Sequence, residues 1–377
     1  MAPAETSVPT APVEESIPTA TVEPASPGRD RSSWRMVVAA VLVALLWPAM
    51  WAGGQGNVDA LLGAGDDGPA RAFVERDIPD LAPLEGIGHD GQQFYAIARH
   101  PFDPAAAGDA VDPAAYRYRR ILFPFLAGLV APDGGRPIIA AFFALSLIGV
   151  ALGAAALKLL PGGPRWLPVA AALSPAVITS LTLSLSDALG AGLGLAAVAA
   201  ATRRRWALAV LAATLAALTR ETFLIVALGL LFTPGMPRPW RLLTLAVPAS
   251  AVGAWMLWLA GRLDTSLLEG GSDQLAVPLT GYFSGDTDPQ TFLMAAMAIA
   301  LLGYGAWRTS RVAPHVAVVL GLQVVLLVCV SELVAFNWVN ALRTAAPLLP
   351  LAIWAVVVRP DTAHADADAD ELVASAA

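Results

Sequence analysis

The feature that most constrains this chain is its series of apolar runs of roughly 15–23 residues, separated by short segments that carry the charges. Only 14% of the residues are charged, whereas a soluble domain carries about a quarter. This pattern predicts an all-α, polytopic bundle of transmembrane helices and excludes most soluble enzymes. The single cysteine, Cys329, lies inside an apolar run and excludes a disulfide framework.

Both ends of the chain differ from this pattern. Residues 1–33 are rich in Pro, Ala, Thr, Ser and Glu, and residues 361–377 alternate Asp with Ala. Such segments bury too little apolar surface to fold, so we expect two disordered tails around a membrane domain at 34–360. For the acidic tail, solvation and weak metal binding are both open.

The positive charges predict the topology, because Arg and Lys stay on the cytoplasmic side. Three arginines precede the first run, which favours an uncleaved helix over a signal peptide and a cytoplasmic N-terminus. The piece 121–131 contains Pro124 and is too short to span, so we expect it to be interfacial or re-entrant. Residues 54–136 then form a large first extracytoplasmic loop with interfacial helices.

If the remaining runs cross the membrane in alternating directions, the basic clusters between them, such as Arg203 to Arg205, lie in the cytoplasm. About ten spans result, with both termini cytoplasmic. The expected spans are 36–51, 137–157, 166–183, 187–202, 206–219, 222–233, 242–260, 290–307, 312–331 and 344–358.

This topology brings charged residues from distant segments to the extracytoplasmic side. They are Asp90, Asp187, Arg220, Glu221 and Arg343. Charges at the edge of a transmembrane bundle are costly and mark functional sites.

The densest polar stretch contains "HDGQQFYAIA". Asp90 there fits an N-cap with Gln93 three residues later, a capping box, and it also fits a catalytic base held at the start of a helix. His89 and Gln93 are candidate substrate-binding residues, with surface polarity as the alternative for His89. Tyr95 is a further candidate, with packing at headgroup level as the alternative.

The other charged motifs also carry two interpretations each. In "YRYRR", Arg117 and Arg120 suit either anionic headgroups or a clamp on a lipid phosphate. Asp187 is either an N-cap or part of the site. Arg220 and Glu221 are either an ion pair with loop residues or functional, and Arg343 is a candidate phosphate ligand.

The small residues that follow Asp187 favour close helix packing over phosphate binding. They are Gly190, Ala191, Gly192 and Gly194. No strand is expected before them, which excludes a dinucleotide-binding motif.

Two of these motifs, "DGQQFYAIA" (90–98) and "YRYRRILFPFLAGL" (116–129), resemble the GT-C superfamily of polytopic glycosyltransferases. The nearest resemblance is to bacterial membrane proteins assigned to cell-surface glycopolymer formation. A more distant likeness to GPI mannosyltransferases includes the acidic residue Asp187 and "LTR" (218–220). The resemblance covers roughly residues 85–345 in order and spacing. Many members carry an acidic pair in the first loop, whereas Gly91 follows Asp90 here.

The resemblance implies inverting transfer of a sugar from a polyprenyl phosphate to a glycan or glycolipid on the extracytoplasmic face of the bacterial plasma membrane. Asp90 would be the general base, and the arginines would stabilise the leaving phosphate. It implies membrane lipids as surroundings, no nucleic acid and no firm cofactor, with a divalent cation left open. The alternatives are a transporter or flippase of lipid-linked saccharides, and a non-catalytic partner in glycopolymer assembly. The absence of an internal repeat favours the enzyme.

Overall fold

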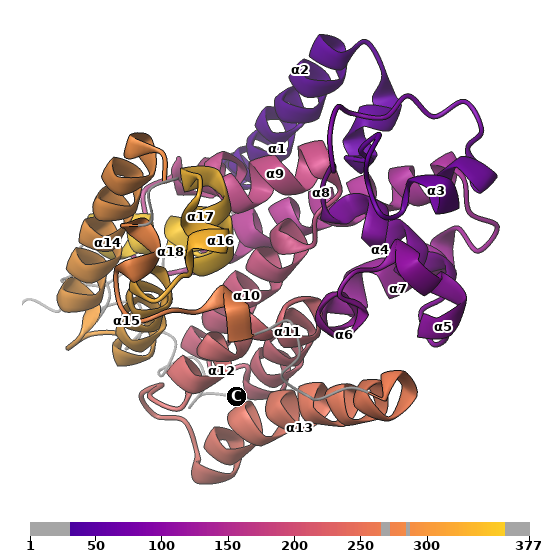
Figure 1. The fold of residues 1–377 in the computed structure, drawn as a ribbon. Coiled ribbons are helices and arrows are strands. Elements are labelled where there is room, and N and C mark those ends of the chain that lie inside the picture. The colour runs from indigo at the N-terminus through magenta and orange to yellow at the C-terminus, as the bar shows by residue number, and fades with distance from the viewer. Residues whose placement is uncertain (1–30, 265–271, 284–286, 359–377) are drawn as a thin grey trace, which may run out of the picture. The chain divides into compact units, whose positions relative to one another are not determined.

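The computed structural model describes residues 31–264, 272–283 and 287–358 (Figure 1). The predicted C-terminal tail (361–377) lies outside the described residues, and so does the predicted N-terminal tail (1–33) except for residues 31–33, which begin α1. The described part is helical throughout; its β-structure consists of isolated bridges such as the one between Ala64 and Gly88. The all-α prediction is therefore confirmed for this part of the chain.

Four helices are long and apolar enough to cross a membrane, which is the composition of a membrane protein. They are Trp34–Gln55, Arg136–Leu159 (α8), Arg238–Leu263 (α13) and Pro289–Thr309 (α14). The first comprises α1 (Arg31–Ala44) and α2 (Leu46–Gln55).

Several other predicted spans are shorter or interrupted helices, so about ten spans remains a prediction. Residues 166–183 form η4 (Leu167–Leu173) and α9 (Pro175–Leu183), because Pro175 has no N–H with which to continue a helix. Helices α17 (Trp338–Ala345) and α18 (Leu349–Val357) are bent by 75°. The other short apolar helices are α10 (Asp187–Thr202), α11 (Trp206–Thr219), η5 (Glu221–Phe223) with α12 (Leu224–Leu230), and α15 (Pro314–Val328).

The predicted first loop consists of short helices that pack on one another and on α8. The segment 121–131 forms the nine-residue α7, too short to span, as predicted. The loop elements are η1 (Val58–Leu62), α3 (Arg71–Asp77), α4 (Asp90–Arg99), α5 (Pro104–Ala107), η2 (Gly108–Ala110), α6 (Ala114–Arg117), η3 (Tyr118–Arg120) and α7 (Leu122–Val130). Three short elements occur in the C-terminal half: η6 (Ser272–Gln274), η7 (Thr280–Tyr282) and α16 (Glu332–Ala335).

Small residues let the backbones of α8 and α10 pack directly against each other. A Cβ on Gly192 would lie 2.1 Å from the Gly149 carbonyl oxygen, and one on Gly190 would lie 2.3 Å from the Phe223 ring. The packing interpretation of the glycines after Asp187 is confirmed. Helix α10 is consequently buried almost all round, and it begins with a charged residue.

Candidate functional site

Asp90 is the first residue of α4, and its side chain does not cap that helix. The N-cap residue is His89, which makes no side-chain capping bond. The Gln93 side-chain carbonyl instead accepts a hydrogen bond from the Asp112 N–H at 3.0 Å. The capping-box prediction is therefore wrong, because both side chains have partners from outside the helix.

The glycine after Asp90 explains how α4 reaches the rest of the bundle. A Cβ on Gly91 would lie 2.2 Å from the Leu62 carbonyl oxygen and 2.4 Å from that of Leu183. Only a residue without a side chain fits between these two carbonyls. Because Leu183 ends α9, just before α10, Gly91 docks the start of α4 beside the start of α10.

Three arginines surround the Asp90 carboxylate. Oδ1 lies 2.6 Å from Nη1 of Arg117, and Oδ2 lies 3.2 Å from Nη1 of Arg120 and 4.0 Å from Nη2 of Arg343. Burial by itself would raise the pKa of the Asp90 carboxyl, but the positive charges outweigh it and hold that pKa well below its usual range. Asp90 is therefore a carboxylate at neutral pH.

Asp187 is likewise the first residue of its helix, with Ser186 at the N-cap position. The N-cap prediction is wrong here too. Oδ1 of Asp187 accepts a short hydrogen bond from Arg220, and Oδ2 lies 3.1 Å from Nη1 of Arg343. Arg343 thus bridges the two aspartates, which are 97 positions apart in the sequence (187 − 90).

The two aspartates and the four arginines that contact them form one charged cluster with an inner and an outer part. In the inner pair, the Asp187 and Arg220 side chains are 2% and 3% exposed; in the rim pair, those of Asp90 and Arg117 are 14% and 20% exposed. Four arginines and two aspartates give a formal charge of +2 (4 − 2). The charged cluster comprises Asp90, Arg117, Arg120, Asp187, Arg220 and Arg343.

Three of the arginines have further partners that hold them in place. The Tyr116 hydroxyl makes a short hydrogen bond with Arg120, and Nε of Arg343 donates to Oδ1 of Asn340 at 3.0 Å. Nε of Arg117 donates weakly to the Asp112 carbonyl at 3.5 Å. We did not predict Tyr116 or Asn340, although spacings of four and three residues from an arginine on a helical turn are signals that could have found them.

Glu221 lies close to the charged cluster. Within the described residues, it forms no ion pair with the cluster. Its charge acts on Arg120, and its Oε2 is buried with no hydrogen-bond partner there. Including Glu221 lowers the local charge to +1 (2 − 1). The neighbouring Arg220 pairs with Asp187, so the sequence neighbours do not pair with each other.

The other predicted site residues have different positions. His89, the N-cap residue of α4, is exposed. Tyr95 is fully buried; its hydroxyl donates to Oδ2 of Asp77 at 2.8 Å and accepts from the Gly135 N–H at 2.6 Å. Tyr95 therefore joins α3, α4 and the start of α8, away from the aspartates of the charged cluster.

The charged cluster does not fit a divalent cation. Both oxygens of Asp90 already contact arginines, and adjacent positive charges oppose a metal ion. Within the described ranges, no group of three or more His, Cys, Asp or Glu side chains is arranged to hold a metal.

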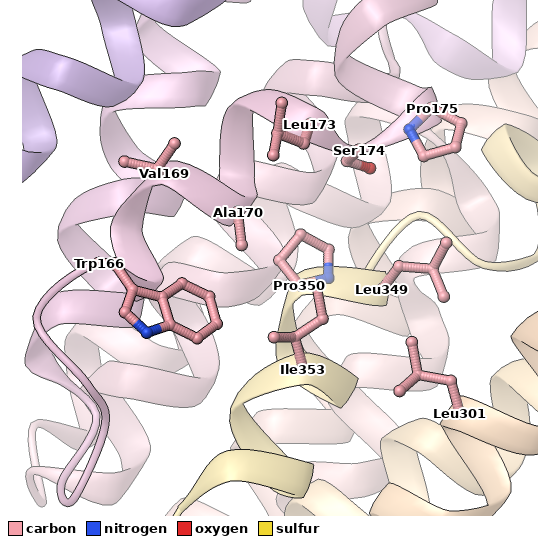
Figure 2. A pocket seen from close by; sticks show the side chains of 10 residues that line it. All are labelled: Trp166, Val169, Ala170, Leu173, Ser174, Pro175, Leu301, Leu349, Pro350 and Ile353. Atoms are coloured by element: carbon pink, nitrogen blue, oxygen red, sulfur yellow. The ribbon is translucent and has the colours of Figure 1, made fainter.

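An apolar cavity of about 410 Å³ opens between η4 and α18 (Figure 2). Trp166, Leu173, Leu349 and Ile353 line it, and Ser174 contributes the one hydroxyl group. The wall at Ser174 and Pro350 continues into a narrow gap that reaches Ala188 and Pro347. Ala188 follows Asp187 in the sequence, and no residue of the charged cluster lines this gap.

No known family model, curated protein or solved structure matches this chain.

Proposed function

We propose that this protein is a membrane glycosyltransferase whose charged cluster binds the phosphate of a polyprenyl-phosphate sugar at the extracytoplasmic face of the bacterial plasma membrane. The observation that carries the proposal is the arrangement of four arginines around two aspartates, one of them at a partly exposed rim, which leaves a positive charge even when Glu221 is included. Arginine suits phosphate because its planar guanidinium can donate two parallel hydrogen bonds.

The reaction needs one base and one anion-stabilising group. Asp90 takes the proton from an acceptor hydroxyl, and that oxygen forms a bond to the anomeric carbon with inversion. The bond between the anomeric carbon and the phosphate oxygen breaks, and polyprenyl phosphate leaves with the electron pair. Arg117, Arg120 and Arg343 stabilise the negative charge that develops on the phosphate. The acceptor is a glycan or glycolipid hydroxyl.

The apolar cavity supports a lipid-linked donor. Its volume of about 410 Å³ is enough for a section of hydrocarbon chain. Its lining matches that chain in polarity.

Reconstituted protein tests the proposal. Liposomes containing wild type or Asp90→Asn are supplied with a panel of polyprenyl-phosphate sugars and candidate acceptors, and released polyprenyl phosphate is measured. We expect turnover by wild type and a loss of at least about 100-fold in the variant. Equal turnover in both would remove Asp90 as the base.

A flippase of lipid-linked saccharides is the second candidate, and the two interrupted helix pairs favour it. Transporters place their binding sites at broken helices, and both breaks, at Ser174 and near Pro350, line the apolar cavity. A fluorescent lipid-linked saccharide that crosses the liposome membrane without cleavage of its phosphate bond would support the flippase and overturn the transferase.

A further inference from the structure

The arginines that contact Asp187 and those that contact Asp90 differ in whether they have other partners. Within the described residues, Arg220 has Asp187 as its one ion-pair partner, and its Nε is buried with no hydrogen-bond partner. By contrast, every arginine that contacts Asp90 has a second contact: Arg117 with the Asp112 carbonyl, Arg120 with Tyr116 and Arg343 with Asp187.

The two aspartates also differ in solvent exposure. The Asp90 side chain and its partners Arg117 and Arg343 are each 14–20% exposed, whereas the side chains of Asp187 and Arg220 are 2–3% exposed. An anion arriving from outside the protein can therefore reach the guanidinium groups of Arg117 and Arg343, whereas Arg120, at 2% exposure, and the inner pair are closed to it.

We infer that Asp90 holds the place of the ligand's phosphate in the free protein, and that phosphate binding to Arg117 and Arg343 displaces the Asp90 carboxylate while Asp187 keeps its arginines. This inference rests on the proposed function for the identity of the ligand. The longest ion-pair distance in the charged cluster, 4.0 Å, separates Asp90 from Arg343, one of the two arginines that would exchange Asp90 for phosphate.

The exchange has a consequence for the chemistry. A carboxylate held by three arginines is a weak base, because each positive charge stabilises its ionised form. A phosphate that takes over two of these arginines neutralises their charge, so the released Asp90 is a stronger base while the donor is bound. Asp90 would thus be activated only when a sugar is in place for transfer. Asp187, by contrast, is a positioning residue that holds Arg343 and Arg220.

The sign of an affinity change tests the inference. Farnesyl phosphate and inorganic phosphate are titrated into the full-length protein in detergent, and binding is measured by calorimetry. If Asp90 competes with phosphate for the same arginines, Asp90→Asn removes the competitor. We then expect binding to tighten by about tenfold, within the usual range for two coupled sites. Asp187→Asn removes a support of Arg343, so we expect weaker binding.

Glu75→Gln is the matched control, because Glu75 forms a surface pair with Arg71 outside the charged cluster. Its loss of one negative charge should leave the affinity nearly unchanged, which separates local competition from a general charge effect. If Asp187→Asn does not fold, the comparison of Asp90→Asn with Glu75→Gln still decides the sign.

Each outcome bears on one of the two proposals. Unchanged or weaker binding by Asp90→Asn, or no binding of either probe to wild type and variant, would overturn the inference. Tighter binding of both probes by Asp90→Asn, without any sugar transfer by wild type, would retain the inference and overturn the transferase. Tighter binding of inorganic phosphate alone would retain the exchange and reject a lipid as the source of the phosphate.

Discussion

The inner pair and the rim pair use the same two residue types in nearly the same local setting, yet their surroundings differ. Asp187 and Asp90 are each the first residue of a helix, and each contacts arginines from other segments. Asp187 is shielded from solvent, whereas Asp90 lies at a partly exposed edge. The difference teaches that an ion pair without access to water fixes structure, while one at an edge can exchange partners.

The largest expected effect comes from breaking the inner pair. Asp187→Asn leaves Arg220 buried without a carboxylate, which costs about 3–5 kcal/mol of the free energy of unfolding. Thermal unfolding in detergent, followed by tryptophan fluorescence, measures the loss. The double variant Asp187→Asn/Arg220→Gln should recover part of it. A double variant no more stable than the single one would contradict the assignment.

Removing the bridge between the pairs should weaken phosphate binding next most strongly. Arg343→Ala deletes a charge-assisted contact to the phosphate, so we expect a loss of about 2 kcal/mol or more, roughly 30-fold in affinity. Arg343→Lys should recover only part, because an ammonium group cannot make two parallel contacts. Titration with farnesyl phosphate measures both variants, and full affinity in Arg343→Ala would exclude this arginine from the site.

A pH series sharpens the comparison at the rim. Asp90→Asn should lower the free energy of unfolding by about 1–3 kcal/mol at neutral pH. The pKa of Asp90 is depressed in the folded protein, so its contribution is complete above its unfolded value of 3.8 and is lost as the pH falls through the folded pKa. The stability difference between wild type and variant should therefore not decrease from pH 8 to 5. A difference that shrinks within that window would show that the arginines do not hold Asp90 ionised.

Tyr95→Phe provides a variant outside both pairs. It removes the hydrogen bonds to Asp77 and Gly135, so we expect a loss of about 1 kcal/mol of stability with unchanged affinity for farnesyl phosphate. A clear loss of affinity for farnesyl phosphate would show that Tyr95 belongs to the binding site.

Glu75→Gln, which removes the ion pair with Arg71 and leaves the Arg71 hydrogen bond to the Asp66 carbonyl in place, should have the smallest effect. Arg71 and Glu75 are each more than a third exposed, and such pairs four residues apart contribute about 0.3–0.5 kcal/mol. Melting curves should nearly coincide with those of wild type. A large shift would show that ion pairs at this surface contribute as much as those of the charged cluster.

Part of the site was predictable because charge in an apolar background is rare. Asp90, Asp187, Arg220, Glu221 and Arg343 were predicted to converge. The structure joins all of them except Glu221 through ion pairs, and Glu221 lies close by. The pairing was not predictable: Glu221 follows Arg220 in the sequence, yet Arg220 pairs with Asp187. Likewise, the local pattern at Asp90 fits a capping box, but contacts with distant arginines took precedence over it.

The sequence by itself determined that this chain is helical and apolar, because long runs without charge can satisfy their backbone only within helices in a membrane. It also determined that the helix after Asp187 packs closely against a neighbour, because its glycines leave room for backbone contact; the structure identified α8 as that neighbour. Only the tertiary structure decided which arginine pairs with which aspartate and which of the two aspartates is partly exposed. These properties depend on distances and burial between segments far apart in the chain, and no local pattern encodes them.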